Sequence, residues 1–293
     1  MSFQITTYYK FAALVPHRLE ELVKSFHNFA DTNTFLGLII IAPEGINATV
    51  AGSVDAINAH KKFLSSQAEL EGIEFKDSFS DSMPFKRFVI KERDEIVTLD
   101  RTDLVPDSKK THLSAAEWHK VLENETDFAL IDVRNWYEVE LGTFPNAIDP
   151  KTERFTEFHD FADKLDIPKD KKILMFCTGG IRCEKASLAM LKKGYSNVHQ
   201  LDGGILKYLE KFPEGKFDGE CFVFDHRVAV DSNLKPSSQY DLCSHCGNPG
   251  NVRISCNLCE KPGVVCKTCN ERIGTCSKNC EHHYQRQLLK ENS

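Results

Sequence analysis

Apolar and polar positions in the first hundred residues follow the period of a strand in some segments and the period of a helix in others. Strands are expected at 4–11, 36–42, 48–51 and 73–76, and helices at 17–33 and 53–66. A turn signal, Pro43-Glu44-Gly45-Ile46-Asn47, follows the second strand. The order βαββαβ predicts a ferredoxin-like α+β domain over residues 1–99. Its last part, 84–99, alternates apolar and charged residues and is expected to extend into a further strand.

A polar stretch over 100–112 predicts a linker, and a different pattern begins at Leu113. Ser114 and Glu117 have the spacing of a capping box that opens a helix. Buried strands are expected at 128–132, 173–176 and 198–201, and helices at 184–193 and 205–211. Strands that alternate with helices predict an α/β domain over 113–220, in which helices cover both faces of a parallel sheet.

Composition agrees with a globular chain of two or three modules. Hydrophobic residues make up 41% of the 293 positions, which is enough apolar surface for separate cores. The first residues lack a basic start followed by an apolar run, and no stretch of about 18 consecutive apolar residues occurs. We therefore expect a cytoplasmic protein that does not contact a membrane.

Charge limits the partners that the chain can attract. The formal net charge of −6 provides no global attraction to nucleic acid, so any RNA contact must be a local basic patch. DNA is not expected as a partner.

Cys177 is the main candidate for covalent chemistry. It follows the apolar run Ile173-Leu174-Met175-Phe176, and reactive groups collect at the carboxyl ends of parallel strands. Gly179 and Gly180 let the backbone curl around the sulfur, while loop N–H groups and Arg182 favour a thiolate. The loop residues expected to contact a bound group are Thr178, Gly179, Gly180 and Ile181.

Other interpretations of these cysteines stay open. A buried structural Cys at a strand end would need neither the glycines nor Arg182, so the pattern favours a reactive residue. Cys183 could resolve a persulfide or sulfenate on Cys177, or simply be a small residue in the first turn of the helix. Candidate catalytic residues are therefore Cys177, Arg182 and Cys183.

The loop resembles that of the rhodanese family, whose catalytic Cys is commonly followed by Gly, Arg and a helix. Asp132-Val133-Arg134, Tyr137-Glu138 and the segment 142–147 are similar to the family's upstream motif, and Asp202-Gly203-Gly204 to its downstream turn. Phe144 and Asn146 replace the usual Ile and Gly, which is expected to alter a turn rather than the chemistry. The resemblance implies a rhodanese fold for 113–220.

Cysteine phosphatases also place a Cys and an Arg at the two ends of a loop. Their pattern has five residues between the two, whereas four separate Cys177 from Arg182. The smaller loop suits a sulfur atom better than a phosphate.

Three longer strings resemble a narrower family, the bacterial tRNA uridine hydroxylases that install 5-hydroxyuridine at the wobble position. The strings are Pro43-Glu44-Gly45-Ile46-Asn47, Pro84-Phe85-Lys86 with Glu95-Ile96-Val97-Thr98, and the segment 177–186. This resemblance implies tRNA as partner, through its anticodon loop, and molecular oxygen as co-substrate. Thiolate addition to C6 of uracil is one plausible route, because it would make C5 electron-rich.

Basic residues near the linker and after the loop are candidates for RNA phosphate contacts. The substrate-binding candidates in the first domain are Lys86, Arg87, Lys91 and Arg93, and Lys185, Lys192 and Lys193 lie on the helix after Cys177. The alternative for each is an ordinary solvated charge. Phe85 and Phe88 are expected in the core rather than under a base.

Residues 221–293 form a cysteine-rich C-terminal module. Its eight paired cysteines are Cys243, Cys246, Cys256, Cys259, Cys266, Cys269, Cys276 and Cys280. Close pairs with this spacing predict two structural zinc ions, which would stabilise a segment with few apolar side chains. His245, His282 and His283 could replace some of these ligands, and the sequence leaves the pairing open.

Two other functions are compatible with the residues. Without the closer resemblance, the loop indicates only a sulfurtransferase that carries a persulfide on Cys177. A zinc-dependent RNA-binding or adaptor protein without catalysis is the third possibility, which the intact loop argues against.

Overall fold

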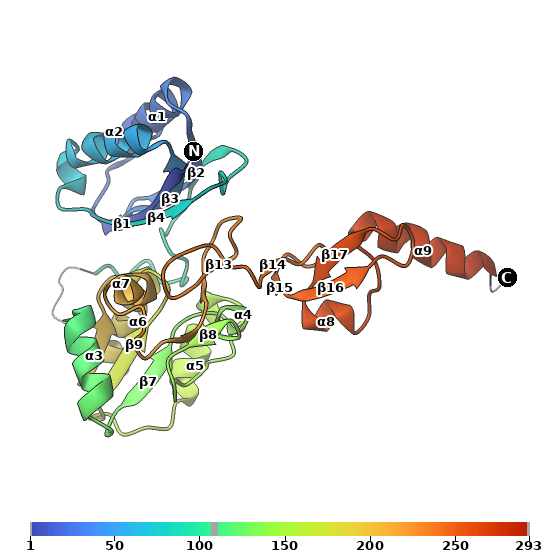
Figure 1. Ribbon diagram of the computed structural model, residues 1–293. Coiled ribbons are helices and arrows are strands. Elements are labelled where there is room, and N and C mark those ends of the chain that lie inside the picture. The colour runs from blue at the N-terminus through green and yellow to red at the C-terminus, as the bar shows by residue number, and fades with distance from the viewer. Residues whose placement is uncertain (1, 107–110, 292–293) are drawn as a thin grey trace. The chain divides into compact units, whose positions relative to one another are not determined.

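The computed structural model describes residues 2–106 and 111–291 and divides into two compact units. The first unit extends to Asp225 and includes 230–235, and the second comprises 226–229 with the residues from Pro236 onward (Figure 1). Within the described ranges, no helix combines the length and apolar character needed to cross a membrane.

The N-terminal domain has the predicted ferredoxin-like order, and the α+β prediction is confirmed. Its elements are β1 (Phe3–Phe11), α1 (Pro16–Thr32), β2 (Phe35–Ala42), β3 (Gly45–Gly52), α2 (Val54–Ser65), β4 (Glu74–Ser80) and β5 (Phe88–Glu92). The sheet order is β4-β1-β3-β2-β5, in which β5 pairs parallel to β2 and the other neighbours are antiparallel. Alternate strand residues such as Ile39 and Ile41 pack with Leu22 and Phe26 of α1, which explains the mixed periods of the sequence.

The second domain contains the predicted parallel sheet, with strand order β6-β10-β9-β7. Its main elements are β6 (His112–Leu113), α3 (Ala115–Asn124), β7 (Ala129–Asp132), α4 (Trp136–Val139), β8 (Gly142–Thr143), α5 (Phe158–Lys164), β9 (Ile173–Phe176), α6 (Ile181–Lys192), β10 (Val198–Leu201), α7 (Gly204–Lys211), β11 (Asp218–Gly219) and β12 (Cys221–Phe222). The short strand β6 was not predicted, because two residues are too few to display a period.

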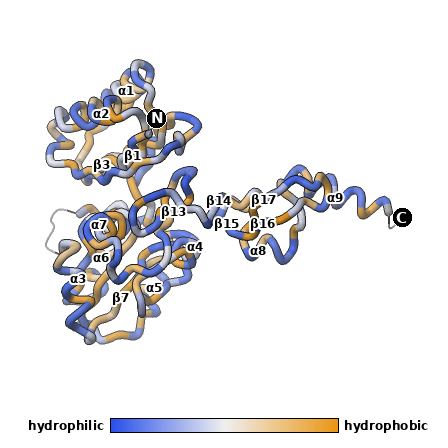
Figure 2. The backbone as a smooth tube through the Cα atoms, in the orientation of Figure 1, coloured by the Kyte–Doolittle hydropathy of each residue, from blue (hydrophilic) through white to orange (hydrophobic). Residues whose placement is uncertain are grey.

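Both faces of this sheet are buried, as the near-continuous apolar strands predict. Along β9, Ile173 and Met175 join the core that contains residues of α5 and α6, whereas Leu174 and Phe176 join the core that contains residues of α3 and α7. Figure 2 shows hydrophobic residues concentrated at β7 within this domain. The layered α/β prediction is therefore confirmed.

Two local conformations follow from the sequence. Helix α6 begins at Ile181, three residues earlier than predicted, because Gly180 has a φ of 99° and turns the chain directly into the helix. Asn146 has a φ of 62°, a left-handed conformation that Asn tolerates better than most residues. Asn146, which stands where the family usually has Gly, therefore adopts a positive φ.

The second unit is a small cysteine-rich fold. Its elements are β13 (Ala229–Val230, shared with the first unit), β14 (Asp241–Leu242), β15 (Pro249–Gly250), β16 (Val252–Ser255), β17 (Pro262–Val265), α8 (Lys267–Asn270) and α9 (Lys278–Glu291). Strands β16 and β17 form an antiparallel hairpin, and the buried core consists of Cys243, Val265 and Cys269. So small a core cannot stabilise the unit alone.

Candidate active site and metal centres

Cys177 directly follows β9 and lies in a loop that wraps its sulfur. The Gly180 N–H donates a hydrogen bond of 3.2 Å to Cys177 Sγ, and the side chain has no exposed surface. The turn Asp202-Gly203-Gly204 leads into a helix that stabilises this loop. The N–H groups of Ile205 and Leu206 donate hydrogen bonds to the carbonyls of Cys177 and Thr178. A Cβ on Gly204 would lie 2.5 Å from the Cys177 carbonyl oxygen, so only glycine fits there.

The surroundings of Cys177 favour its thiolate. Burial alone would raise the pKa of the thiol, but a hydrogen bond from the Cys183 side chain, the charge of Arg182 and backbone N–H groups together lower it to about 6. At neutral pH the residue is therefore mainly a thiolate, the form that acts as a nucleophile. Burial and the Cys177 sulfur raise the pKa of Cys183 well above its ordinary value, so Cys183 stays a thiol.

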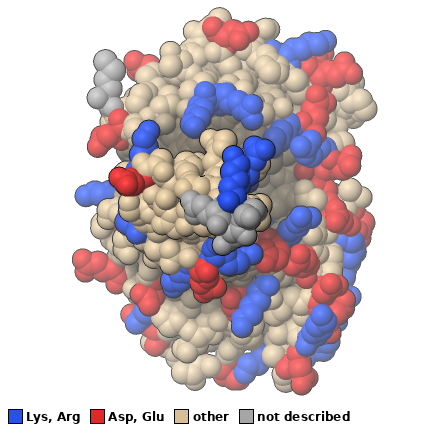
Figure 3. Space-filling view, turned by 90° about the vertical axis from the view of Figure 1, so that its right-hand side faces the viewer, with Lys and Arg blue, Asp and Glu red and all other residues tan. Residues whose placement is uncertain are grey.

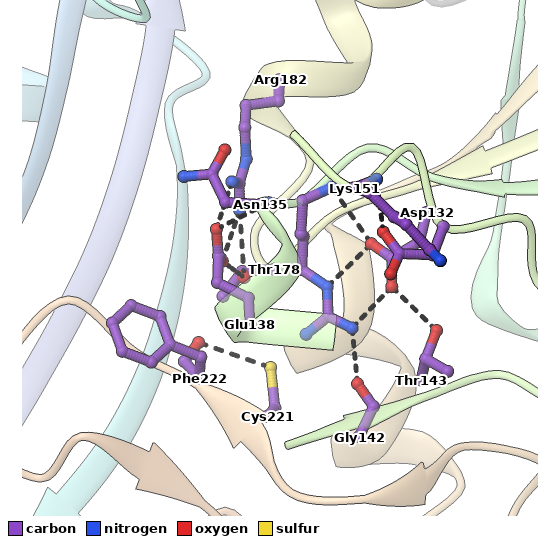
Figure 4. A network of polar contacts seen from close by, with 12 residues as sticks. Asp132, Asn135, Glu138, Gly142, Thr143, Lys151, Thr178, Arg182, Cys221 and Phe222 are labelled. Carbon is purple, nitrogen blue, oxygen red and sulfur yellow. Dashed lines mark hydrogen bonds and ion pairs between the residues drawn. The ribbon is translucent and has the colours of Figure 1, made fainter. Parts of the chain in front are cut away.

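Arg182 is held by a buried carboxylate rather than standing as a free charge. Glu138 accepts two hydrogen bonds from the guanidinium, at 2.5 and 2.8 Å, and a third from Thr178 Oγ1 at 3.2 Å (Figure 4). Burial opposes the charge of Glu138, yet Arg182 keeps the pKa of this carboxyl below its ordinary value. Glu138 therefore connects Thr178 and Arg182, near the two ends of the loop. The sequence motif included Glu138 but did not predict this role.

A second buried pair braces the neighbouring segment. Arg134 donates to both carboxylate oxygens of Asp132, at 2.9 and 2.6 Å, and to the Gly142 carbonyl at 2.5 Å. Thr143 Oγ1 also donates to Asp132, at 2.8 Å. Both charged side chains are fully buried, so the Asp-x-Arg motif stabilises the structure next to the loop.

Glu138→Ala is expected to destabilise the first unit by about 3–5 kcal/mol, because Arg182 would remain buried without its counter-charge. Urea unfolding followed by tryptophan fluorescence would measure the loss. Glu140→Ala, an exposed acidic position just after the same short helix, is the matched control and should change stability by less than about 0.5 kcal/mol. Equal stability of the two variants would contradict this role of Glu138.

The four basic residues expected to contact RNA in the first domain are all exposed. Lys91 lies in β5, Lys86 and Arg87 precede it, and Arg93 follows it. None of the four forms an ion pair in the part of the chain that the structure describes. Figure 3 shows one face of the molecule, on which basic and acidic side chains are interspersed, as a modest net charge implies.

The prediction that Lys185 contacts RNA is wrong. Its side chain is fully buried and pairs with Glu44 at 2.8 Å and with Glu95. Lys192 and Lys193 are paired with Asp103 and Asp163, respectively.

The ion pairs of Lys185 connect three segments that are far apart in the sequence. Glu44 comes from the β2–β3 turn, Glu95 from the segment after β5, and Lys185 from α6. Asn47 Nδ2 also donates to the Ile96 carbonyl at 3.0 Å, and Ile96 N–H donates to Glu44 at 2.8 Å. The strings therefore meet at one junction between the N-terminal domain and the helix of the Cys177 loop.

Sequence reasoning missed a polar cluster beside the loop. Glu184 Oε1 accepts from Tyr9 Oη at 2.8 Å and lies 3.0 Å from His112 Nε2, while Glu184 Oε2 accepts from Gln200 at 3.3 Å. Lys76 Nζ lies 4.9 Å from the centre of the Tyr9 ring. These residues come from both domains and share no sequence motif, so no local signal could have grouped them.

The eight paired cysteines form two clusters in the second unit. Cys243, Cys246, Cys266 and Cys269 make one, and Cys256, Cys259, Cys276 and Cys280 make the other. The first and third pairs along the chain share one cluster and the second and fourth share the other, so the two sites interleave. His245 instead contacts the Thr275 carbonyl, and neither His282 nor His283 joins a described cluster.

The donor sets fit a tetrahedral metal ion. The sulfurs within each cluster lie within 4.8 Å of one another, and closest pairs such as Cys246–Cys266 and Cys259–Cys276 are 3.6 Å apart. Four sulfurs placed about 2.3 Å from a zinc ion at tetrahedral corners would be roughly 3.8 Å apart. These separations are too long for disulfides, and all the cysteines are free. Two metal sites are therefore compatible with the fold.

A parallel sheet with a cysteine loop at the end of a central strand, braced by buried Asp–Arg and Glu–Arg pairs, defines a rhodanese-type protein. Family models agree segment by segment. They match the UPF0176 acylphosphatase like domain over 3–96, the Rhodanese-like domain over 114–211 and the Rhodanase C-terminal over 218–281.

Relatives with curated names show which family within the rhodanese-type proteins this chain resembles. A tRNA uridine(34) hydroxylase of Bdellovibrio bacteriovorus is 44% identical over 98% of this chain and 83% of that protein. Proteins of the same name from Picosynechococcus sp. and Synechocystis sp. are 42% and 39% identical, each over 92% of this chain and over 91% and 100% of their own lengths. The chain belongs to the tRNA uridine(34) hydroxylase family.

Proposed function

We propose that this protein hydroxylates C5 of uridine 34 in tRNA, with molecular oxygen as co-substrate and Cys177 as the reactive residue. The observation that carries the proposal is a cysteine at the end of β9 whose sulfur accepts a hydrogen bond from the Gly180 N–H, in a loop held by the buried Arg182–Glu138 pair. These surroundings lower the pKa of the thiol. Relatives that bear this name match nearly the whole chain.

The proposed chemistry starts with the Cys177 thiolate. Its sulfur bonds to C6 of uracil, the C5=C6 π bond opens, and the electron pair spreads over C5 and O4. The electron-rich C5 then takes one oxygen atom from dioxygen. The other oxygen atom leaves as water, which consumes two protons and two electrons from a reductant. Loss of the C5 proton and departure of the thiolate restore the ring.

In this proposal each loop residue has a separate task. Cys177 is the nucleophile, Arg182 with Glu138 holds the loop, and the backbone of Thr178, Gly179, Gly180 and Ile181 surrounds the added group. The buried thiol of Cys183 is either a resolving residue or a packing residue. Exposed Lys86, Arg87, Lys91 and Arg93 would contact phosphates of the anticodon loop.

We also propose zinc as the metal of both cysteine clusters. Four thiolates form a soft, anionic donor set that zinc prefers in closed structural sites. Zinc would supply folding energy to the second unit rather than take part in the reaction.

A persulfide sulfurtransferase is the second candidate, because an activated thiolate in a small loop also suits a persulfide. A non-catalytic RNA-binding protein would not need a thiol with this lowered pKa.

Oxygen labelling separates the two enzymatic functions. With ¹⁸O-labelled dioxygen, tRNA and a reductant, the protein is expected to introduce label into uridine, which nucleoside mass spectrometry would detect. The same reaction with unlabelled dioxygen in labelled water is the control. Unlabelled tRNA together with fast sulfide release from thiosulfate would favour the sulfurtransferase.

A further inference from the structure

A cavity of about 200 Å³ lies between strands of the N-terminal domain and two segments that adjoin the Cys177 loop, the start of α6 and the turn at Asp202 and Gly203. Tyr9, Phe11 and Lys76 line it from the N-terminal domain, and Glu184 and Gly203 line it from the rhodanese domain. Pockets for larger organic ligands enclose about 300–1,000 Å³. The cavity therefore suits a single ring better than a whole cofactor.

Tyr9 lies next to the Cys177 loop, and Lys76 Nζ lies 4.9 Å from the centre of the Tyr9 ring. A Cβ on Gly180 would lie 2.9 Å from Tyr9 Oη, and the N–H of the same Gly180 donates to Cys177 Sγ. Burial mainly raises the pKa of Tyr9 and mainly lowers that of Lys76, and the charge of Cys177 acts on both groups. Strand β1 thus brings the Tyr9 hydroxyl to the Cys177 loop, and the neighbouring strand β4 places Lys76 beside Tyr9.

The charges around the cavity favour a neutral ligand with both donors and acceptors. Glu184 already accepts hydrogen bonds from Tyr9 and Gln200, and Lys207 pairs with Glu74 and Asp202. Lys76 forms no ion pair among the described residues. The lining holds both lysines, Lys10 and Lys76, and carboxylates. Uracil offers two carbonyl oxygens to an ammonium and one N–H to an acceptor, so it matches this mixed lining.

We infer that this cavity receives the uracil ring of the uridine that is modified, and that Lys76 donates a hydrogen bond to one of its carbonyl oxygens. The inference rests on the function proposed above and gives the N-terminal domain a part of the active site. When the sulfur bonds to C6, the C5=C6 electron pair moves towards O4, where the ammonium stabilises the developing charge.

Three variants test the role of Lys76. Lys76→Met is expected to lower kcat/KM for tRNA hydroxylation roughly 10- to 100-fold, and Lys76→Arg should recover part of the loss. Lys62→Met removes an exposed lysine from α2 of the same domain and should keep wild-type kinetics. The melting temperature should stay close to wild type in all three. Wild-type kinetics of Lys76→Met would overturn the inference.

Photo-crosslinking gives a readout that does not depend on turnover. Full-length protein is irradiated with tRNA that carries 4-thiouridine at position 34, and crosslinked peptides are identified by mass spectrometry. Crosslinks to peptides with Tyr9 or Lys76 support the inference, even if wild-type protein does not hydroxylate and the proposed function fails. Crosslinks confined to the cysteine-rich unit, or formed at the cavity only from positions 33 or 35, refute it.

Discussion

Cys177→Ser is expected to lower 5-hydroxyuridine formation by roughly 10³-fold or more while the fold stays intact. A serine hydroxyl at this position would remain protonated at neutral pH, whereas the surroundings lower the pKa of the Cys177 thiol to about 6. Nucleoside mass spectrometry of tRNA from cells whose only copy is the variant would measure the loss. Circular dichroism would verify the fold.

Cys221→Ser is the matched control for this variant. Cys221 is also fully buried in the first unit, but burial raises the pKa of its thiol to about 12, so it is no nucleophile. The control should retain most activity. Normal 5-hydroxyuridine with Cys177→Ser would remove Cys177 from the mechanism. Equal loss with Cys183→Ser would indicate that the two cysteines work as a pair, whereas a milder loss would indicate packing.

Removal of metal is expected to unfold the second unit and to leave the first unit folded. Structural zinc contributes about 10–16 kcal/mol of apparent binding free energy in small zinc peptides, and the apolar core of this unit is small. Purified, reduced protein should contain about two zinc ions per chain. After treatment with a chelator, limited proteolysis should cut within residues 236–293 while the rhodanese sheet remains protected.

Because the two cysteine clusters alternate along the chain, loss of one cysteine ligand is expected to affect both sites. Cys259→Ser removes a ligand of one cluster but should loosen both sites, because each cluster spans segments that belong to the other. Ser244→Ala changes a residue between two ligands without removing a sulfur, and should bind zinc normally. Protein purified without chelator that holds almost no zinc, yet resists protease in this unit, would show that the clusters are not metal sites.

The periodic segments of the sequence were sufficient to predict the two larger folds. Mixed strand and helix periods over the first hundred residues indicated the ferredoxin-like sheet, and short apolar runs between helices indicated the parallel sheet. Local contacts and burial on one or both faces dominate these patterns, so they are visible without knowledge of distant residues. The Cys177 loop was also predictable, since its glycines and its cysteine are contiguous in the chain.

Interactions between distant residues were not predictable in this way. Lys185 looked like a surface lysine, yet it is buried because Glu44 and Glu95, about 140 and 90 positions earlier, neutralise it. Tyr9 contacts Glu184 of α6, and Lys76 lies beside Tyr9 only because β1 and β4 pair in one sheet.

The sequence by itself therefore determined which folds form, which cysteine follows a buried strand in a glycine-containing loop, and which cysteines come in close pairs with the spacing of metal ligands. Only the tertiary structure decided which pairs share a site and that Glu138 neutralises Arg182. It also decided which residues of the N-terminal domain line the cavity that Glu184 and Gly203 border. The reason is physical: periodicity and loop composition report on neighbours along the chain, whereas charge pairing, metal geometry and cavities depend on atoms that only folding brings within a few ångströms of one another.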